Sequence, residues 1–199
     1  MNNSYYEALQ QRRTHYAISG QSPIPDEQII ERVEYAVKHS PSAFNSQSAR
    51  AVILFGENHQ TLWSKTLDIL QKIVPPEAFS STEEKIRSFA AGHGSVLFFD
   101  DTAVTEGLMQ AFPLYKDNFP VWAQQANGML QHAVWTSLTL EGLGASLQHY
   151  NPLIDDAVKE AFGLPQQWKL IAQMPFGTPT APPSPKEFLP AQDRVRVLR

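Results

Sequence analysis

The chain has 199 residues, and its 16 basic and 20 acidic side chains give a net charge of −4, which provides no general attraction to nucleic acid or to an anionic membrane. It contains no cysteine, so disulfides, thiolate metal sites and cysteine nucleophiles are excluded, and any redox chemistry has to come from a bound cofactor. We expect a single cytoplasmic domain over residues 1–199, because no signal-like segment and no run of ~18 apolar residues is present.

The first third of the chain predicts two helices and a strand. Ser4 to Arg13 is typical of a short helix, and Asp26 to Ser40 repeats apolar residues at helical spacing with acids in its first turn. Residues 15–25 contain a glycine and two prolines and are expected to form a loop. Ala51 to Phe55 is wholly apolar, which favours a strand covered on both faces.

Residues 39–48 form a polar junction between the second helix and this strand. Pro41 ends the helix, and the hydroxyl and amide groups that follow can both donate and accept hydrogen bonds. A planar heterocycle with alternating carbonyls and ring nitrogens requires that mixture. The junction is therefore a candidate ligand site, although its composition fits an ordinary loop equally well.

The middle of the chain alternates helix and strand. His59 to Val74 predicts a helix that Pro75-Pro76 breaks, and Ser81 or Thr82 can cap another that runs to Ala91. Ser95 to Phe99 is a second apolar strand. The Asp100-Asp101 pair that follows could bind a metal or act as a base, but no third carboxylate or well-spaced histidine is near, so helix capping is favoured and no metal is predicted.

Residues 112–122 are rich in aromatic rings and prolines. The rings of Phe112, Tyr115, Phe119 and Trp122 predict a pocket wall or lid, with core packing under a loop as the alternative. Val121 to about Leu143 then predicts the longest helix. Its apolar residues occupy more than one face, so we expect it to be central and buried.

The last third predicts a strand from Ala145 to Tyr150, a helix from Pro152 to Phe162 that Gly163 closes, and a strand from Trp168 to Met174. Residues 176–199 form an extended, proline-rich tail that cannot build a core of its own. It is either disordered or laid over another surface, and the alternation of valine and arginine near its end permits a short edge strand.

The common catalytic motifs are absent from the sequence. No Gly-x-Gly-x-x-Gly follows a strand, and the phosphate-loop, Gly-x-Ser-x-Gly and His-Glu-x-x-His patterns are missing too. A Rossmann dinucleotide site, a serine hydrolase and a zinc hydrolase are therefore disfavoured.

Three segments in order carry a family resemblance: Arg-Arg-Thr at 12–14, Pro-Ser-Ala-Phe-Asn-Ser-Gln at 41–47, and Glu-Gly-Leu-Gly-Ala-Ser-Leu-Gln-His-Tyr-Asn-Pro at 141–152. On these segments the chain resembles the FMN-dependent nitroreductase family. The last segment and the aromatic stretch at 112–122 are similar to the branch named after a yeast fatty-acid-repression protein. The resemblance implies an α+β fold, a nitroreductase-like α/β sandwich with a central, mainly antiparallel sheet flanked by helices. It also implies a homodimer with a domain-swapped tail and FMN at the subunit interface.

The resemblance also implies roles for particular residues. Arg12 and Thr14 would approach the pyrimidine or ribityl side of FMN, and Arg13 the phosphate or the dimethylbenzene edge. A second set would line the cofactor from the other subunit: Pro41, Ser42, Phe44, Asn45 and Gln47. A third set would face the ring near N5 through its backbone: Leu147, Gln148, His149, Tyr150 and Asn151. Lys186 and Arg194, with Arg196 in reserve, would hold the phosphate, although the basic pair usual after the Gly-x-Pro element is replaced here by Pro185-Lys186-Glu187.

The implied activity is a ping-pong oxidoreduction. NADH or NADPH would give a hydride to flavin N5, and a nitroaromatic or quinone-like acceptor would then take the electrons, with the aromatic stretch forming the acceptor pocket. No catalytic side chain is expected, because the cofactor carries the reaction. The alternative is a non-catalytic flavin-binding or fatty-acid-binding regulatory protein.

Overall fold

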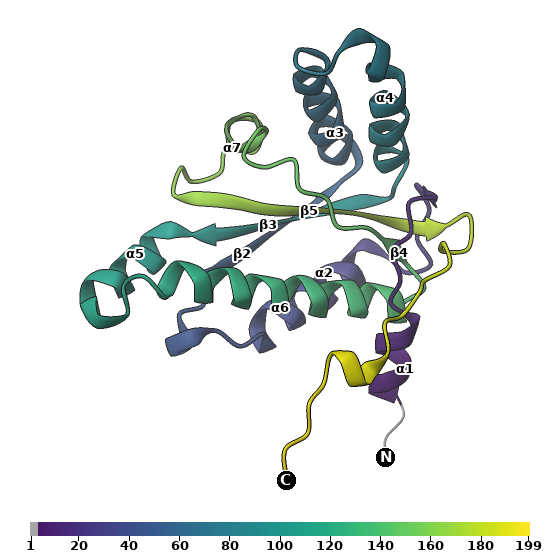
Figure 1. The fold of residues 1–199 in the computed structure, drawn as a ribbon. Helices are drawn as coiled ribbons and strands as arrows, with labels where there is room; N and C mark the ends of the chain where they lie inside the picture. The colour runs from purple at the N-terminus through teal and green to yellow at the C-terminus, as the bar shows by residue number, and fades with distance from the viewer. Residues whose placement is uncertain (1–3) are drawn as a thin grey trace.

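An antiparallel sheet forms the centre of the computed structural model, which describes residues 4–199 (Figure 1). Its middle strand β3 (Gly94–Asp101) pairs on one side with β2 (Ala49–Phe55) and on the other with the long strand β5 (Trp168–Pro179). Two short strands, β1 (Ile18–Ser19) and β4 (Gly144–Ala145), pair with the end of β5. The strand order is β1-β5-β3-β2, which leaves β2 at one edge of the sheet.

Strand β3 divides the core into two layers. All of its residues are buried, and alternate side chains point to opposite faces of the sheet. Val96 and Phe98 belong to one hydrophobic cluster, whereas Leu97 and Phe99 belong to the other. A strand buried on both faces has to be covered by helices on both sides, and Figure 1 shows helices above and below the sheet.

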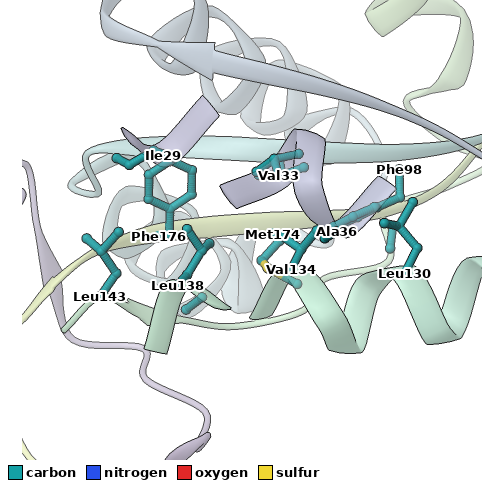
Figure 2. Packing of buried hydrophobic residues seen from close by; sticks show 13 residues of the cluster. Ile29, Val33, Ala36, Phe98, Leu130, Val134, Leu138, Leu143, Met174 and Phe176 are labelled. Carbon is teal, nitrogen blue, oxygen red and sulfur yellow. The ribbon is translucent and has the colours of Figure 1, made fainter. Parts of the chain in front are cut away.

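Helices α2 (Asp26–His39) and α6 (Phe119–Leu140) cover one face. Their apolar side chains meet those of β3 and β5 in a continuous layer. Figure 2 labels ten members: Ile29, Val33, Ala36, Phe98, Leu130, Val134, Leu138, Leu143, Met174 and Phe176. Each large side chain fully buried in such a layer contributes about 1.5 to 3 kcal/mol to stability.

Three further helices cover the other face of the sheet: α3 (Gly56–Gln71), α4 (Pro76–Ala90) and α7 (Asp155–Phe162). Helix α1 (Ser4–Gln11) packs beside α6, and α5 (Thr102–Ala111) follows β3 directly. Helix α7 ends at Gly163, which adopts the left-handed conformation at φ 61° as the sequence predicts. Within residues 4–199, no helix combines the length and hydropathy that a membrane span would require.

The helices predicted from periodicity are confirmed to within a few residues for α1, α2, α3 and α6. The capping role of the acidic pair is also confirmed, because the Asp101 side chain accepts from the Ala103 N–H at the start of α5. The carboxylate of Asp100 accepts instead from Thr105 Oγ1 at 3.0 Å. On α6, Met129 and Leu140 remain exposed, so the expectation that they are buried is wrong for the single chain.

Four local predictions are wrong, three of them because strand pairing beyond the segment decides the outcome. Strand β2 is an edge strand and mostly half-buried, whereas β3 is the strand covered on both faces. Helix α4 begins at Pro76 and not at Ser81, because proline at the first helical position loses no hydrogen bond. The strand predicted from Ala145 to Tyr150 stops after Ala145, and Gln148 continues only as a single bridge to Gln173. The loop predicted at residues 15–25 contains β1, which exists because β5 extends to Pro179 and offers it a partner.

A buried hydrogen-bond network joins α3 to the sheet. His59 Nε2 lies 3.2 Å from the carbonyl oxygen of Ala90, and Nδ1 lies 3.0 Å from Ser95 Oγ. The same Oγ accepts a hydrogen bond from Trp63 Nε1. A carbonyl can only accept, so Nε2 carries the proton and Nδ1 accepts from the Ser95 hydroxyl. Burial of the ring lowers the pKa of His59 to about 4, because the charged imidazolium would lose its hydration.

This network predicts that the protein loses stability as the pH falls. The folded-state pKa of His59 lies below its unfolded value, so the unfolded chain binds the extra proton first, and stability declines from about pH 6.5 towards pH 4. The loss attributable to this residue is at most about 3 kcal/mol. Urea unfolding at several pH values should show a shallower decline for His59→Gln, which does not titrate. Equal declines in the two proteins would contradict this account.

Candidate functional site

A groove runs along α6 and is made of two hollows that share Gly128 and Gln131. The first has a volume of about 380 Å³ and is lined by Arg12, Thr14, Gly128, Gln131, His132, Trp135 and Leu147. The second has a volume of about 500 Å³ and is lined by Pro120, Gln124, Gly128, Gln131, His149, Asn151, Lys169, Leu170 and Ile171. The two hollows together form a polar groove beside the segment that follows β4.

Backbone pairing holds the Arg-Arg-Thr segment at this groove. Thr14 forms a parallel bridge with Ala145, and the N–H of His15 donates to the Ala145 carbonyl at 2.9 Å. The chain after β4 then brings Leu147 to the same hollow. Residues far apart in sequence therefore reach one site because β4 pairs on one side with β5 and meets residue 14 on the other.

Arg12 is a partly buried cation without an acidic partner. Its guanidinium carbon lies 4.5 Å from the centre of the Trp135 ring, and in residues 4–199 no carboxylate lies within ion-pair distance of it. Burial and, to a lesser degree, the charge of Arg13 lower the pKa of the Arg12 guanidinium. An anion or a polarised carbonyl at this position would relieve both effects.

A third hollow of about 260 Å³, here called the cationic hollow, adjoins Arg12 on the side of the C-terminal tail. It is lined by Arg12, Arg13, Thr14, Tyr16, Ser184, Pro185 and Lys186, with no acidic residue among them. The guanidinium of Arg13 donates to the Ser184 carbonyl, which fixes the start of the tail against the end of α1. Three cations and three hydroxyl side chains around one hollow suit a phosphate group.

Two further observations fit a planar, polar ligand in the α6 groove. Gly128 sits in the middle of α6, where glycine is unfavourable by about 0.5–1 kcal/mol relative to alanine. A Cβ there would meet no atom within 4 Å, so the position opens directly onto the groove. Trp135, whose ring lines the first hollow, has its Nε1 buried without a partner in residues 4–199. Gly128 therefore leaves space for a ligand in the groove, and Trp135 Nε1 leaves a hydrogen-bond donor available to it.

The part of the polar junction from Pro41 to Ser48, here called the 41–48 junction, is held in a strained conformation. Phe44, Asn45 and Gln47 have φ angles of 57°, 49° and 50°, which non-glycine residues rarely adopt. The Ser42 hydroxyl accepts from the N–H of Gln47 at 2.9 Å, and Arg50 binds both the Gln47 carbonyl and, at 2.9 Å, Asp101 Oδ2. Strain of this kind collects at binding loops, at about 1–3 kcal/mol per residue.

The junction lies on a different hollow from Arg12. Pro41, Ser42 and Gln47 line a mainly apolar cavity of about 480 Å³ between α2, β2 and α6. Phe44 turns instead towards the aromatic stretch, where its ring centre lies 4.9 Å from that of Phe112 and 5.3 Å from that of Phe119. The predicted acceptor wall thus forms one cluster with Phe44: Phe112, Tyr115, Phe119 and Trp122.

Within one chain, the predicted site residues fall into separate groups. Arg12, Thr14, Leu147, His149 and Asn151 line the α6 groove, and Arg13 and Lys186 line the adjoining cationic hollow. The side chains of two other predicted residues do not line the groove. Gln148 is buried, and Tyr150 packs edge-on to Trp63 in the core, where burial raises its pKa.

Neither predicted tail arginine reaches the cationic hollow in this chain. Arg194 and Arg196 are exposed and line none of the hollows described above, so of the three predicted phosphate ligands only Lys186 lies near Arg12. The edge strand that the tail sequence permits does not form in the single chain, where η3 (Ala191–Asp193) is the only regular segment after β5 among the described residues.

Sequence reasoning missed three groove residues on α6 itself: Gly128, Gln131 and Trp135. A usable signal was present. Asn127 and Gln131 are amides four residues apart, so they fall on one side of the helix, and a glycine lies between them.

A model of the nitroreductase family matches residues 9–178 of the chain. The chain belongs to the nitroreductase family. Two Saccharomyces cerevisiae proteins, putative nitroreductase HBN1 and nitroreductase FRM2, are 37% and 36% identical to it over 188 residues, which cover 94% of this chain and 93% of each relative. The resemblance predicted from the three segments is thereby confirmed.

Solved nitroreductase structures share the fold. Nitroreductase CinD from Lactococcus lactis, in complex with chloramphenicol, superposes with a TM-score of 0.90 at 41% identity and covers 98% of this chain and 100% of its own. A nitroreductase with bound FMN from Desulfitobacterium hafniense superposes over the full length of both chains at 0.72 with 14% identity. The expected α+β nitroreductase sandwich is therefore confirmed, and membership of the family makes the protein an oxidoreductase.

The strained junction predicts an unusual substitution pattern at Gln47. Gln47→Gly and Gln47→Ala both remove the side chain, but only glycine adopts φ near 50° without strain. The glycine variant should therefore be the more stable of the two by about 1 kcal/mol. Chemical denaturation of both variants measures the difference. An alanine variant as stable as the glycine variant would show that position 47 stores no strain.

Proposed function

We propose that this nitroreductase holds FMN in the α6 groove and uses NADH or NADPH to reduce nitroaromatic or quinone-like acceptors. The observation that carries the proposal is the partly buried cation Arg12, which pairs with no carboxylate of residues 4–199. An open helical glycine and an indole N–H without a partner in the same residues lie beside it. A related fold with FMN bound and the CinD complexes with chloramphenicol and 4-nitrophenol support it.

In this proposal the polar groups of the groove bind and orient the cofactor. Arg12 and Thr14 hold the pyrimidine or ribityl side, and Arg13 and Lys186 hold the phosphate in the cationic hollow. Of the predicted segment 147–151, Leu147, His149 and Asn151 face the ring, because the backbone of Gln148 pairs with Gln173 and the N–H of Tyr150 donates to the Gln173 side chain. Bound FMN supplies the redox chemistry, accepting a hydride from NAD(P)H and passing electrons to the acceptor in a ping-pong cycle. No side chain is required to transfer a proton in the hydride step.

The aromatic cluster supplies the acceptor surface. Phe44 is held by the strained junction with its ring about half exposed, and the Trp122 ring stacks against it at an interplanar angle of 20°. A flat, electron-poor nitroaromatic ring binds well against such aromatic faces, which also exclude water from the reacting atoms. The cluster therefore favours planar aromatic acceptors over small polar ones.

The site is shared between two subunits in this proposal. The junction group and the Arg12 group line different hollows of one chain, so a second subunit is needed to bring a junction to each α6 groove. The chain also leaves β2 as an unpaired sheet edge, and its tail over residues 180–199 exposes Phe188, Leu189, Val195, Val197 and Leu198. A tail exchanged between subunits would cover the open edge of the partner's sheet and would bury its own apolar side chains there.

The redox role is tested by the absorbance of the purified protein. We expect a yellow protein, or a colourless one that turns yellow with FMN. Its flavin band should bleach when NADH or NADPH is added without oxygen and return when a nitroaromatic acceptor follows. A protein that stays colourless with added FMN would refute the proposal. A yellow protein that neither nicotinamide bleaches would instead favour the regulatory alternative.

Deletion of residues 180–199 tests the shared site. The truncated chain should lose both dimerisation and FMN, because a ligand that binds only the assembled form stabilises that form by mass action. Sedimentation and flavin absorbance can be measured on one sample, with full-length protein as the control. A truncated protein that remains dimeric and yellow would show that the tail is needed neither for dimerisation nor for FMN binding.

A further inference from the structure

Two buried amides interrupt the apolar face of α6. Asn127 is fully buried and Gln131 is 7% exposed, and their spacing of four residues places them on the same side of the helix. Buried amides are retained only where hydrogen bonds satisfy them, so each of their polar atoms needs a partner.

The hydrogen bonds fix the orientation of both amides. Asn127 Nδ2 lies 2.9 Å from the carbonyl oxygen of Phe99, which can only accept, so this atom is the donor. Asn127 Oδ1 therefore faces Gln131, where it lies 2.7 Å from Nε2 and accepts from it. This chain of bonds leaves the Gln131 oxygen, Oε1, as an acceptor to which no residue of 4–199 donates.

That acceptor belongs to the groove. Gln131 lines both hollows of the α6 groove, beside the open position at Gly128. A rotated Gln131 amide would place two oxygens against each other and leave Asn127 Oδ1 unsatisfied, which is costly for a buried acceptor. The groove is therefore built with one acceptor held in place before any ligand enters.

We infer that Gln131 Oε1 accepts a hydrogen bond from the imide N–H of the flavin ring, and that Asn127 is the residue that positions it. The inference rests on the FMN site proposed above. The imide nitrogen, N3, is the only ring nitrogen of oxidised flavin that carries a hydrogen, so a single fixed acceptor selects one orientation of the ring in the groove.

The test compares FMN with its N3-methyl analogue, which lacks this hydrogen. Fluorescence titration of the flavin-free full-length protein should show that the wild type binds FMN about fivefold more tightly than the analogue, the range for one neutral hydrogen bond. In Gln131→Leu this preference should fall to about one. In Gln125→Leu, the same change at an exposed residue of the same helix that lines neither hollow of the groove, it should persist.

Asn127→Ser tests the positioning role. Serine is too short to bridge the Phe99 carbonyl and the Gln131 amide, so the Gln131 amide can rotate and the preference for FMN over the analogue should decrease. Thermal unfolding of the variant checks that it is folded. The comparison of ligands on wild type requires no substitution, so poor folding of a variant cannot obscure it.

Three results are decisive against the inference. Equal affinity of wild type for FMN and the analogue would overturn it and leave the FMN site intact. A preference that survives in Gln131→Leu would mean that the methyl group is excluded by shape and not by loss of a hydrogen bond. No binding of FMN to wild type at any concentration tested would refute the proposed function itself.

Discussion

Burial of β3 on both faces is the constraint on which the rest of the structure depends. Because every residue of Gly94–Asp101 is buried, helices have to cover both sides, and the alternation of side chains divides the core into two clusters. Polar groups that a ligand can reach therefore lie at the ends of the strands and along the borders of the covering helices. The α6 groove and the 41–48 junction occupy those positions.

Helix α6 serves both the core and the groove. Leu130, Val134 and Leu138 fill the layer against the sheet, while Gly128 and Gln131 border the groove. A helix that packs on a rigid sheet has little freedom to shift, so groups at its border are held accurately. The same argument explains the polar network from Phe99 to Gln131, because its first member is a backbone carbonyl of β3 itself.

The parts of the fold that follow from local patterns are the parts that the sequence predicts. Helix α2 shows apolar spacing, acids at its start and a proline after its end, and each acts within a few residues. Strands β1 and β4 have two residues each and exist only because β5 extends far enough to pair with them, which no local pattern contains. The length of β5 was underestimated for the same reason, since its last residues are those that pair with β1.

The candidate site also contains residues that the sequence predicts and residues that only the fold reveals. Arg12 and the 41–47 segment were identified because their residue types are unusual for a core and resemble a known family. Gly128 and Trp135 were missed, because a helical residue becomes part of a site only when the surface beside it is known. The position of Phe44 against Phe112 also depends on a positive φ that composition does not reveal.

The central claim is that one FMN site is assembled from the α6 groove of one subunit and the 41–48 junction of its partner. Complementation between two defective subunits tests it most directly. Arg12→Glu should disable the groove side and Ser42→Trp the junction side, so each homodimer should bind FMN poorly. A heterodimer purified through two different tags would then contain one intact and one doubly defective site, and should bind one FMN per dimer with wild-type affinity. A heterodimer as defective as its parents would show that the site lies within a single chain.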